Sequence, residues 1–315
     1  MSESSSCRST IQENLASLRI ECLIIKQSKM SFENEITACI LQYNPVAEIL
    51  NEKGIACRMV HVRDKNLAFR LLPVPFEGLQ EIPSTYFQGQ TLEYAEQNVQ
   101  LVHLWQDCWV AKKEIVRSRI AVLSGSCVRI HARQTYVRRI SRDIMFDFFA
   151  TNHLLSFVNG RYNYGLFFDG QLVAAASFSS GRNVMRDGVK YRSFELLRYA
   201  NLLNYRVTGG LGKLITRFVQ DVNPDDIMTY VDLDWGAGKG YQKLKFEQIA
   251  VTPPQTFWIH PDELIRYYAH RLPRQLTDDF YRMKNRNMDD FLIERGYVKI
   301  YNAGNLKYLN TIIKK

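Results

Sequence analysis

Three closely spaced glycines are the residues of this chain whose type and spacing most clearly allow chemistry. Gly209, Gly210 and Gly212 lie in the segment "NYRVTGGLGKLI", where an apolar run gives way to a helical pattern. A loop that leaves a strand and opens a helix presents backbone N–H groups at the positive helix end, and these bind phosphate. Glycine permits the backbone angles and the close approach that such a loop needs. Arg206 and Lys213 add positive charge, so the segment is interpreted as either a phosphate-binding loop or a tight turn.

The spacing of these glycines excludes two common phosphate-binding motifs. The segment "GGLGKLI" lacks the GxxxxGK[ST] spacing of a Walker loop, and the chain contains no GxGxxG fingerprint. A phosphate bound at this loop would therefore belong to another class of ligand.

The charge of the chain favours an anionic partner. The formal net charge is +9 and the pI is about 9.2, which suits nucleic acid, a phosphorylated cofactor or an acidic surface. A group of arginines between residues 129 and 142 could track the phosphates of DNA or RNA. These are Arg129, Arg133, Arg138, Arg139 and Arg142. The same residues also suit a solvated basic surface, so both interpretations stay open.

Composition predicts a globular, cytoplasmic protein. Hydrophobic residues make up 46% of the chain, enough for packed cores, and no run of about 18 apolar residues predicts a membrane span. The six cysteines are scattered and form no CxxC pair, which is typical of a reducing compartment. The six histidines are equally dispersed, so we expect no metal.

The elements that must position these residues divide the chain in two. Residues 1–126 form an α/β unit of their own in this interpretation. We expect a strand near 20–26, then a helix, a glycine stop and a strand across 44–62. A helix leading into a short strand follows over 91–105, and an amphipathic helix over 109–125.

Residues 127–315 are expected to form a second unit, with a C-terminal extension from about 253. A strand over 127–140 precedes a helix with Ser141 as its N-cap, and the clearest hairpin turns at Asp169-Gly170. The further expected elements are a strand over 194–202, a helix after the glycine loop, a strand over 226–233, a short helix over 240–246 and a strand over 247–251. This order predicts an α/β fold with a mixed central sheet flanked by helices, preceded by a smaller α/β domain.

The run of motifs from 127 to 252 resembles the GNAT superfamily of acyl-CoA-dependent N-acyltransferases. In that family a loop of form [QR]-x-x-G-x-[GA] after the fourth strand cradles the pyrophosphate of coenzyme A, and a later helix carries a "YEKLGF"-like segment. Gly210 and Gly212 match the first motif, with Val207 at its first position, and "YQKLKF" over 241–246 matches the second. The resemblance implies acetyl-CoA or another acyl-CoA as cofactor. The implied cofactor-binding residues are Arg206, Val207, Gly209, Gly210, Leu211, Gly212 and Lys213.

Two side chains acquire catalytic roles through the same resemblance. Glu195, twelve residues ahead of Val207, stands close to where several family members carry a glutamate base, and Tyr241 matches the tyrosine that serves as acid. Glu195 could instead only pair with a neighbouring arginine, Arg192 or Arg198, and Tyr241 could only pack its ring. Three further polar residues could line the same cleft, namely Asn201, Asp232 and Asp234. The acceptor stays open among a small amine, a peptide amine and a modified nucleobase.

A weaker resemblance covers most of the chain. Several segments are similar to phage and mobile-element proteins in which a restriction-type nuclease domain, like that of very-short-patch repair endonucleases, precedes a GNAT-like domain. Where such proteins show "YHxxKT", this chain has "YFQGQT", with Gln90 at the lysine position, and only Asp107 and Glu114 remain as carboxylates. The alternative function is therefore a non-catalytic, nucleic-acid-associated protein with a degenerate nuclease domain and a GNAT-like scaffold.

Overall fold

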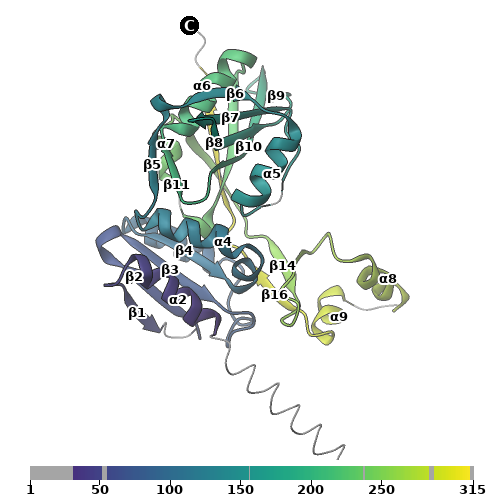
Figure 1. The fold of residues 1–315 in the computed structure, drawn as a ribbon. Coiled ribbons are helices and arrows are strands. Elements are labelled where there is room, and N and C mark those ends of the chain that lie inside the picture. The colour runs from purple at the N-terminus through teal and green to yellow at the C-terminus, as the bar shows by residue number, and fades with distance from the viewer. Residues whose placement is uncertain (1–30, 52–54, 156, 237, 284–286, 313–315) are drawn as a thin grey trace, which may run out of the picture.

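The protein consists of two stacked α/β parts and a projecting C-terminal extension (Figure 1). The computed structural model describes residues 31–51, 55–155, 157–236, 238–283 and 287–312. The strand expected near 20–26 lies outside these residues. None of the helices in the described ranges is long and apolar enough to cross a membrane.

The N-terminal part is a four-stranded sheet with helices on both faces. The strand order is β1-β2-β3-β4, antiparallel except for the parallel pair β3 and β4. All six residues of β3 are buried, as expected for a strand covered on both sides. The elements are α2 (Phe32–Tyr43), β1 (Glu48–Asn51), β2 (Arg58–Val62), η1 (Arg63–Lys65), β3 (Leu67–Leu72), α3 (Tyr86–Glu96), β4 (Gln100–Trp105) and α4 (Gln106–Leu123).

Alternating side chains of this sheet face different helices. Phe69 and Val102 pack in one cluster with α2 and α4, through residues such as Ile36. Ala68 and Leu101, their neighbours in the chain, belong to a separate cluster with Tyr94 of α3. The period-two pattern thus places α3 opposite the other two helices.

The second part is built on an eight-stranded mixed sheet. Its order is β13-β17-β12-β10-β8-β7-β6, with β9 paired to β10, and only β10 and β12 run parallel. A separate two-stranded sheet joins β5 and β11. The strands are β5 (Val128–His131), β6 (Tyr136–Arg139), β7 (Tyr162–Phe168), β8 (Gln171–Phe178), β9 (Arg182–Arg186), β10 (Val189–Asn201), β11 (Tyr205–Thr208), β12 (Asp226–Asp232), β13 (Glu247–Thr252) and β17 (Asn305–Thr311).

Helices α5 (Arg142–Asn152) and α6 (Gly210–Val222) cover opposite faces of this sheet. Phe149 of α5 packs with Ala175, whereas Phe218 of α6 packs with Ala174 and Ala176. Two short 3-10 helices and one further helix complete this part: η2 (Ala132–Gln134), η3 (Leu233–Trp235) and α7 (Lys239–Gln242). The expected mixed central sheet flanked by helices, preceded by a smaller α/β unit, is confirmed.

The C-terminal extension leaves the sheet and returns to it. It holds β14 (Thr256–Ile259), β15 (Arg266–Tyr268), α8 (Arg274–Arg282), α9 (Met288–Glu294) and β16 (Val298–Tyr301). These strands form a small sheet of order β15-β14-β16. The chain then enters the main sheet as β17, between β12 and β13, so residues beyond 252 complete the same sheet.

Most local predictions are confirmed, and two are corrected. Ser141 caps α5, since its Oγ accepts the Ile144 N–H at 3.3 Å, and the hairpin turns at Asp169-Gly170. The helix expected after residue 44 is wrong, because β1 occupies Glu48–Asn51 as an exposed edge strand paired with β2. The single strand expected over 127–140 is two strands, interrupted by η2.

Candidate active site

Two parallel strands of the main sheet separate and open a cavity. β10 and β12 pair only from Ser193 to Glu195 on β10, and a register shift follows between Leu196 and Arg198. Beyond this point β12 continues along β17, while β10 continues along β8. The bulge turns β10 away from its neighbour, and a cavity of about 370 Å³ lies beside the diverging ends. Crevices at the carboxyl ends of parallel strands are common ligand sites.

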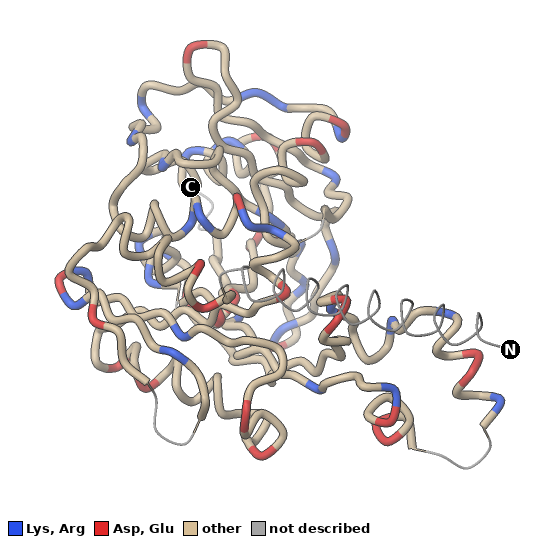
Figure 2. The backbone as a smooth tube through the Cα atoms, turned by 60° about the horizontal axis from the view of Figure 1, so that its bottom comes forward, with Lys and Arg blue, Asp and Glu red and all other residues tan. Residues whose placement is uncertain are grey.

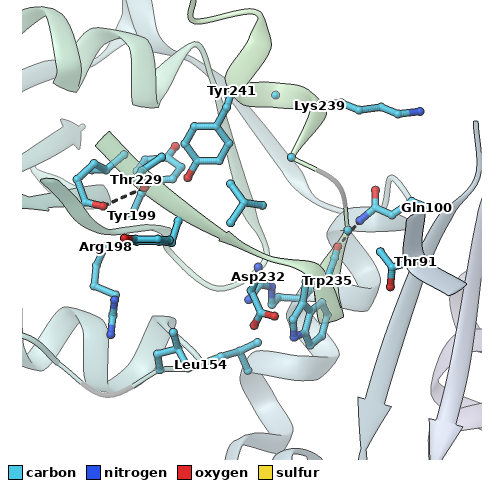
Figure 3. A pocket seen from close by; sticks show the side chains of 18 of the residues that line it. Thr91, Gln100, Leu154, Arg198, Tyr199, Thr229, Asp232, Trp235, Lys239 and Tyr241 are labelled. Carbon is cyan, nitrogen blue, oxygen red and sulfur yellow. Dashed lines mark hydrogen bonds between the residues drawn. The ribbon is translucent and has the colours of Figure 1, made fainter. Parts of the chain in front are cut away.

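Both parts of the protein form the walls of this cavity (Figure 3). The second part contributes β10, β12, α7, η3 and the residues after α5, and the N-terminal part contributes α3, β4 and α4. The polar and aromatic lining residues include Thr91, Gln100, Arg119, His153, Arg198, Tyr199, Thr229, Asp232, Trp235 and Tyr241. A second cavity of about 250 Å³ adjoins the first and shares Arg119, His153, Tyr199 and Trp235 with it.

Hydrogen bonds between the two parts hold η3 in place at this cavity. Gln100 Nε2 donates to the carbonyl of Trp235 at 2.7 Å, and Thr91 Oγ1 donates to the carbonyl of Leu233 at 3.3 Å. Gly236 permits the contact, because its φ is 129° and a Cβ there would lie 2.9 Å from Gln100 Nε2. The position of η3 thus depends on both parts of the chain.

Tyr241 is the predicted catalytic residue that the structure places in the cavity. It lies on α7, its ring stacks on Tyr308 with centroids 5.8 Å apart, and its hydroxyl is hydrogen-bonded to that of Thr229. Burial raises the pKa of Tyr241 above its ordinary value. The side chain therefore stays protonated at neutral pH and can donate a proton inside the cavity.

Asp232, at the end of β12, is a carboxylate of the same cavity. Its Oδ1 accepts the backbone N–H of Asp234 at 3.0 Å. Burial raises the pKa of Asp232, and the charge of Arg119 opposes this effect. Asp234 does not line the cavity, since it is buried beneath it and its Oδ1 accepts the N–H of Ala303 at 2.7 Å.

Two further cavity residues are not identified by the glycine motif: Arg119, which lies on α4, and His153, which directly follows α5. Arg119 of α4 lies over the ring of Trp235, with its guanidinium carbon 4.4 Å from the ring centroid. The Arg119 side chain is exposed to the solvent of the cavity, but protein lies on its other sides. The partial loss of water lowers the pKa of its guanidinium. Burial, together with Arg119 and Arg198, lowers the pKa of His153 to about 3, so this imidazole is neutral.

The glycine loop lies next to the cavity without lining it. Gly209 is exposed, has a φ of 77° and is the N-cap of α6, with no side chain capping the helix. Within the described residues, the N–H groups of Gly210 and Gly212 have no hydrogen-bond acceptor, as expected in the first turn of a helix. Tyr199 connects the cavity to the glycine loop, because it lines the cavity and its hydroxyl faces the backbone N–H of Leu211.

The other predicted residues of the loop face in different directions. Val207 is buried in the core, so only its backbone could contact a ligand, whereas Arg206 is exposed. Lys213 Nζ donates to the carbonyls of Ala132 and Thr135, which holds η2 against α6. The positive charge nearest the loop therefore already has two acceptors.

Glu195 does not line either of the two cavities. Its carboxylate accepts a hydrogen bond from Arg182 at 3.3 Å, and its side chain is 21% exposed. The next residue, Leu196, is the first of β10 to line the main cavity. Asn201 lines the second cavity and accepts a hydrogen bond from the Tyr199 hydroxyl at 2.9 Å.

The arginines predicted to contact nucleic acid are exposed on β5, η2 and β6. They are Arg129, Arg133, Arg138 and Arg139. The guanidinium of Arg138 lies 4.7 Å from the ring centroid of Tyr136, and that of Arg139 lies 5.4 Å from that of Tyr162. Figure 2 shows Lys and Arg positions spread along the whole backbone and interspersed with Asp and Glu.

The two carboxylates considered for a nuclease, Asp107 and Glu114, each lie beside an arginine. Asp107 forms an ion pair with Arg266, at 2.8 Å, and Glu114 is exposed beside Arg117. Gln90 accepts a hydrogen bond from Arg70. In the described part of the chain, no group of three His, Cys, Asp or Glu side chains is arranged to hold a metal ion. The structure thus adds no support for the nuclease resemblance.

Comparisons with known proteins give fold likenesses at low similarity. No protein-family model matches the chain, and no curated protein matches it. Among solved structures, it is similar to a Bacillus subtilis acetyltransferase in complex with CoA, with 11% identity, a TM-score of 0.32 and coverage of 57% of this chain and 99% of that one. It is also similar to a GNAT family acetyltransferase from Elizabethkingia anophelis with acetyl-CoA bound, with 8% identity, a TM-score of 0.28 and the same coverage.

A third likeness is to Arabidopsis thaliana Naa50 in complex with the bisubstrate analogue CoA-Ac-MVNAL. The identity is 11%, the TM-score is 0.30, and 57% of this chain and 99% of that one are covered. At these TM-scores the likenesses carry no argument about activity. The proposal below therefore rests on the motifs of the sequence and the geometry of the site.

Proposed function

We propose that the protein is an acyl-CoA-dependent N-acyltransferase, with acetyl transfer to an amine as the specific reaction. The observation that carries the proposal is the position of the Tyr241 hydroxyl, which lies in the cavity opened by the diverging parallel strands β10 and β12. Tyr199 links that cavity to the glycine-rich start of α6. A proton donor and an anion-binding helix end are thus adjacent.

The loop residues fit the pyrophosphate of coenzyme A. At the positive end of α6, Gly209 is exposed, Gly212 is half-buried with a free N–H group, and Gly210 is buried beneath them. Arg206 is exposed beside them, and Val207, Leu211 and Lys213 fix the backbone around the loop. Acyl-CoA supplies the acyl group as a thioester.

The side chains of the cavity fit the proton transfers of this reaction. The amine nitrogen attacks the thioester carbonyl, a C–N bond forms and the C–S bond breaks. Tyr241 donates its proton to the departing thiolate and regains one through solvent or Thr229. A base removes one proton from the ammonium before the attack, and the nitrogen loses a second proton to solvent as the amide forms, which balances the proton that Tyr241 regains. The products are an amide, free coenzyme A and one proton.

Glu195 is the base that we propose for this step, acting through water. Its carboxylate is partly exposed, and its backbone adjoins Leu196 at the start of the cavity. Such a water-mediated route requires Glu195 to lose its bond to Arg182 or to share its two oxygens between Arg182 and water.

Cofactor binding can be tested without knowledge of the acceptor. We expect purified protein to retain coenzyme A in native mass spectrometry, and acetyl-CoA at 100 times its Kd to stabilise the fold by about 2.7 kcal/mol. Gly209→Asp is a sharp test, because aspartate tolerates a positive φ and a Cβ there would meet only Ala132, at 3.5 Å. Its carboxylate would repel the pyrophosphate.

Gly209→Asn is the matched control for this variant. Asparagine has the same shape and the same tolerance of positive φ, but it carries no charge. We expect Gly209→Asp to weaken acetyl-CoA binding at least about tenfold relative to Gly209→Asn. Equal binding by the two variants, or no binding by the unmodified protein, would contradict the proposed cofactor site.

Nucleic-acid association is the second candidate function. It rests on the exposed arginines Arg129, Arg133, Arg138 and Arg139, which lie on consecutive elements of one edge. DNA or RNA binding that weakens steeply with added salt would support it, because released counterions give that dependence. A lack of binding to either at low ionic strength would exclude it.

A further inference from the structure

The main cavity contains two opposite charges that face the same space and do not form an ion pair with each other. From this arrangement we infer that the acceptor is a small, amino-acid-like zwitterion, with its ammonium held by Asp232 and its carboxylate by Arg119. This inference rests on the proposed acyltransfer, and it assigns the substrate class of that same site. It also gives the N-terminal part, which carries Arg119, a direct role in substrate recognition.

Arg119 is held in place while its hydrogen-bond donors stay available. Its guanidinium lies 4.4 Å above the ring of Trp235, and within the described residues it has no hydrogen-bond or ion-pair partner. Stacking on an aromatic face fixes the plane of a guanidinium, and its N–H edge then matches a carboxylate in bidentate geometry. Arg198, the other arginine of the cavity, donates to the carbonyl of Leu197 at 2.7 Å. Arg119 is therefore the better anion site.

Asp232 is the complementary group. Among the described residues its only hydrogen-bond partner is the N–H of Asp234, so one carboxylate oxygen is left for a ligand, and the charges of Arg119 and Arg266 act on it without direct contact. Asp232 and Arg119 attract each other across the cavity without closing into an ion pair. A partly buried charge without a direct partner is unfavourable, and a ligand that supplies the opposite charge relieves this cost.

The size and the walls of the cavity favour a small acceptor. A volume of about 370 Å³ is at the lower end for small-molecule sites. α3, β4 and α4 of the N-terminal part wall one side of it. Figure 3 shows Asp232 beside Trp235, with the Tyr241 hydroxyl farther along the cavity toward Tyr199. An ammonium bound at Asp232 would thus share the cavity with the proposed proton donor.

Binding measurements on the full chain test this inference. The probes are the twenty protein amino acids, each compared with the amine that lacks its carboxylate, in calorimetric and thermal-shift titrations without any CoA. We expect at least one amino acid to bind at least about tenfold more tightly than its decarboxylated amine, the loss expected for one charged hydrogen-bonded contact. Arg119→Gln should remove this difference, and Arg119→Lys should restore part of it.

Arg117→Gln is the matched control, because Arg117 lies on the same helix, outside both cavities, and pairs with Glu114. It should bind amino acids like the unmodified protein. The inference is overturned if no amino acid binds, if the decarboxylated amines bind equally well, or if the preference survives Arg119→Gln. Native mass spectrometry measures CoA retention in a separate experiment. A protein that binds amino acids but no CoA would contradict the proposed acyltransferase activity and leave the proposed amino-acid site intact.

Discussion

The charge of Asp232 gives a prediction about stability that does not require any substrate. Burial raises the pKa of this carboxyl above its ordinary value, and Asp234, whose pKa is also raised by burial and by the charge of Asp232, lies two residues away. A raised pKa means that the folded protein binds the proton more tightly than the unfolded chain. The ionised form of Asp232 therefore destabilises the fold.

Asp232→Asn should consequently be more stable than the unmodified protein at pH 8. Asparagine keeps an oxygen that can accept the Asp234 N–H, which donates to Asp232 at 3.0 Å in the unmodified protein. The substitution removes the charge of residue 232 and with it the repulsion between two neighbouring carboxylates. The net gain is about 1 kcal/mol, because the loss of a charge-assisted hydrogen bond offsets part of the relief. For a chain of this length that corresponds to a rise in Tm of about 2 °C.

The pH dependence identifies the cause of this gain. Below about pH 4 Asp232 is protonated in both the folded and the unfolded chain, so the two proteins should be equally stable. The difference should grow as the pH rises from the ordinary pKa of Asp, near 4, to the raised folded-state pKa and then stay constant. Urea unfolding between pH 4 and pH 8 measures it, with Asp169→Asn, an exposed turn carboxylate at a φ of 46°, as the control. A variant less stable than the unmodified protein at pH 8 would refute the unpaired-charge argument.

Three further substitutions test the site and its support. Tyr241→Phe should lower kcat at least about a hundredfold and leave CoA retention unchanged, and unchanged turnover would remove Tyr241 from the mechanism. Glu195→Gln should lower kcat at least about a hundredfold and leave CoA retention unchanged, whereas unchanged turnover would place the base elsewhere. Arg266→Gln should destabilise the fold by about 3 kcal/mol in urea unfolding, because the side chain of Asp107 is only 7% exposed and would lose its charge partner. Adding Asp107→Asn should recover part of that loss, and a full loss in the double variant would contradict the ion-pair argument.

Local signals in the sequence are sufficient for helix starts and tight turns. The cap at Ser141, the turn at Asp169-Gly170 and the glycines that start α6 each act through the backbone of their own segment. Chemistry of this kind depends on neighbours in the chain, so it can be recognised without the fold. Tyr241 was found for the same reason, through a continuous six-residue segment.

Elements defined by distant partners could not be predicted in this way. All four residues of β1 are exposed, and the strand exists because β2 pairs with it, whereas its sequence suits a helix. β11 lies inside the presumed glycine loop and pairs with β5, which stands more than seventy residues earlier. β17 enters between β12 and β13 after a long excursion, and no periodicity of its own sequence indicates that position. Strand pairing of this kind is set by tertiary context.

The same limit applies to the charged residues of the cavity. The sequence suggests Asp232 as a polar residue of the cleft, but nothing in it distinguishes this residue from a solvated surface carboxylate. For Arg119 the sequence predicts only a place in an amphipathic helix. The feature that makes them interesting, opposite charges that face one cavity without pairing, arises only when α4 packs against η3.

The two parts of the protein share one hydrophobic core and therefore act as one unit at this site. A single cluster of buried residues extends from Leu72 and Trp105 of the N-terminal sheet to Phe194 and Ile227 of the main sheet. Gln88 of α3 also donates to the carbonyls of Thr252 and Ala303, where the extension leaves and re-enters the main sheet. Removing the N-terminal part would therefore expose core, release η3 and take away Arg119 together. Point substitutions in the full chain, which change one charge and leave this core intact, separate recognition from folding where truncation does not.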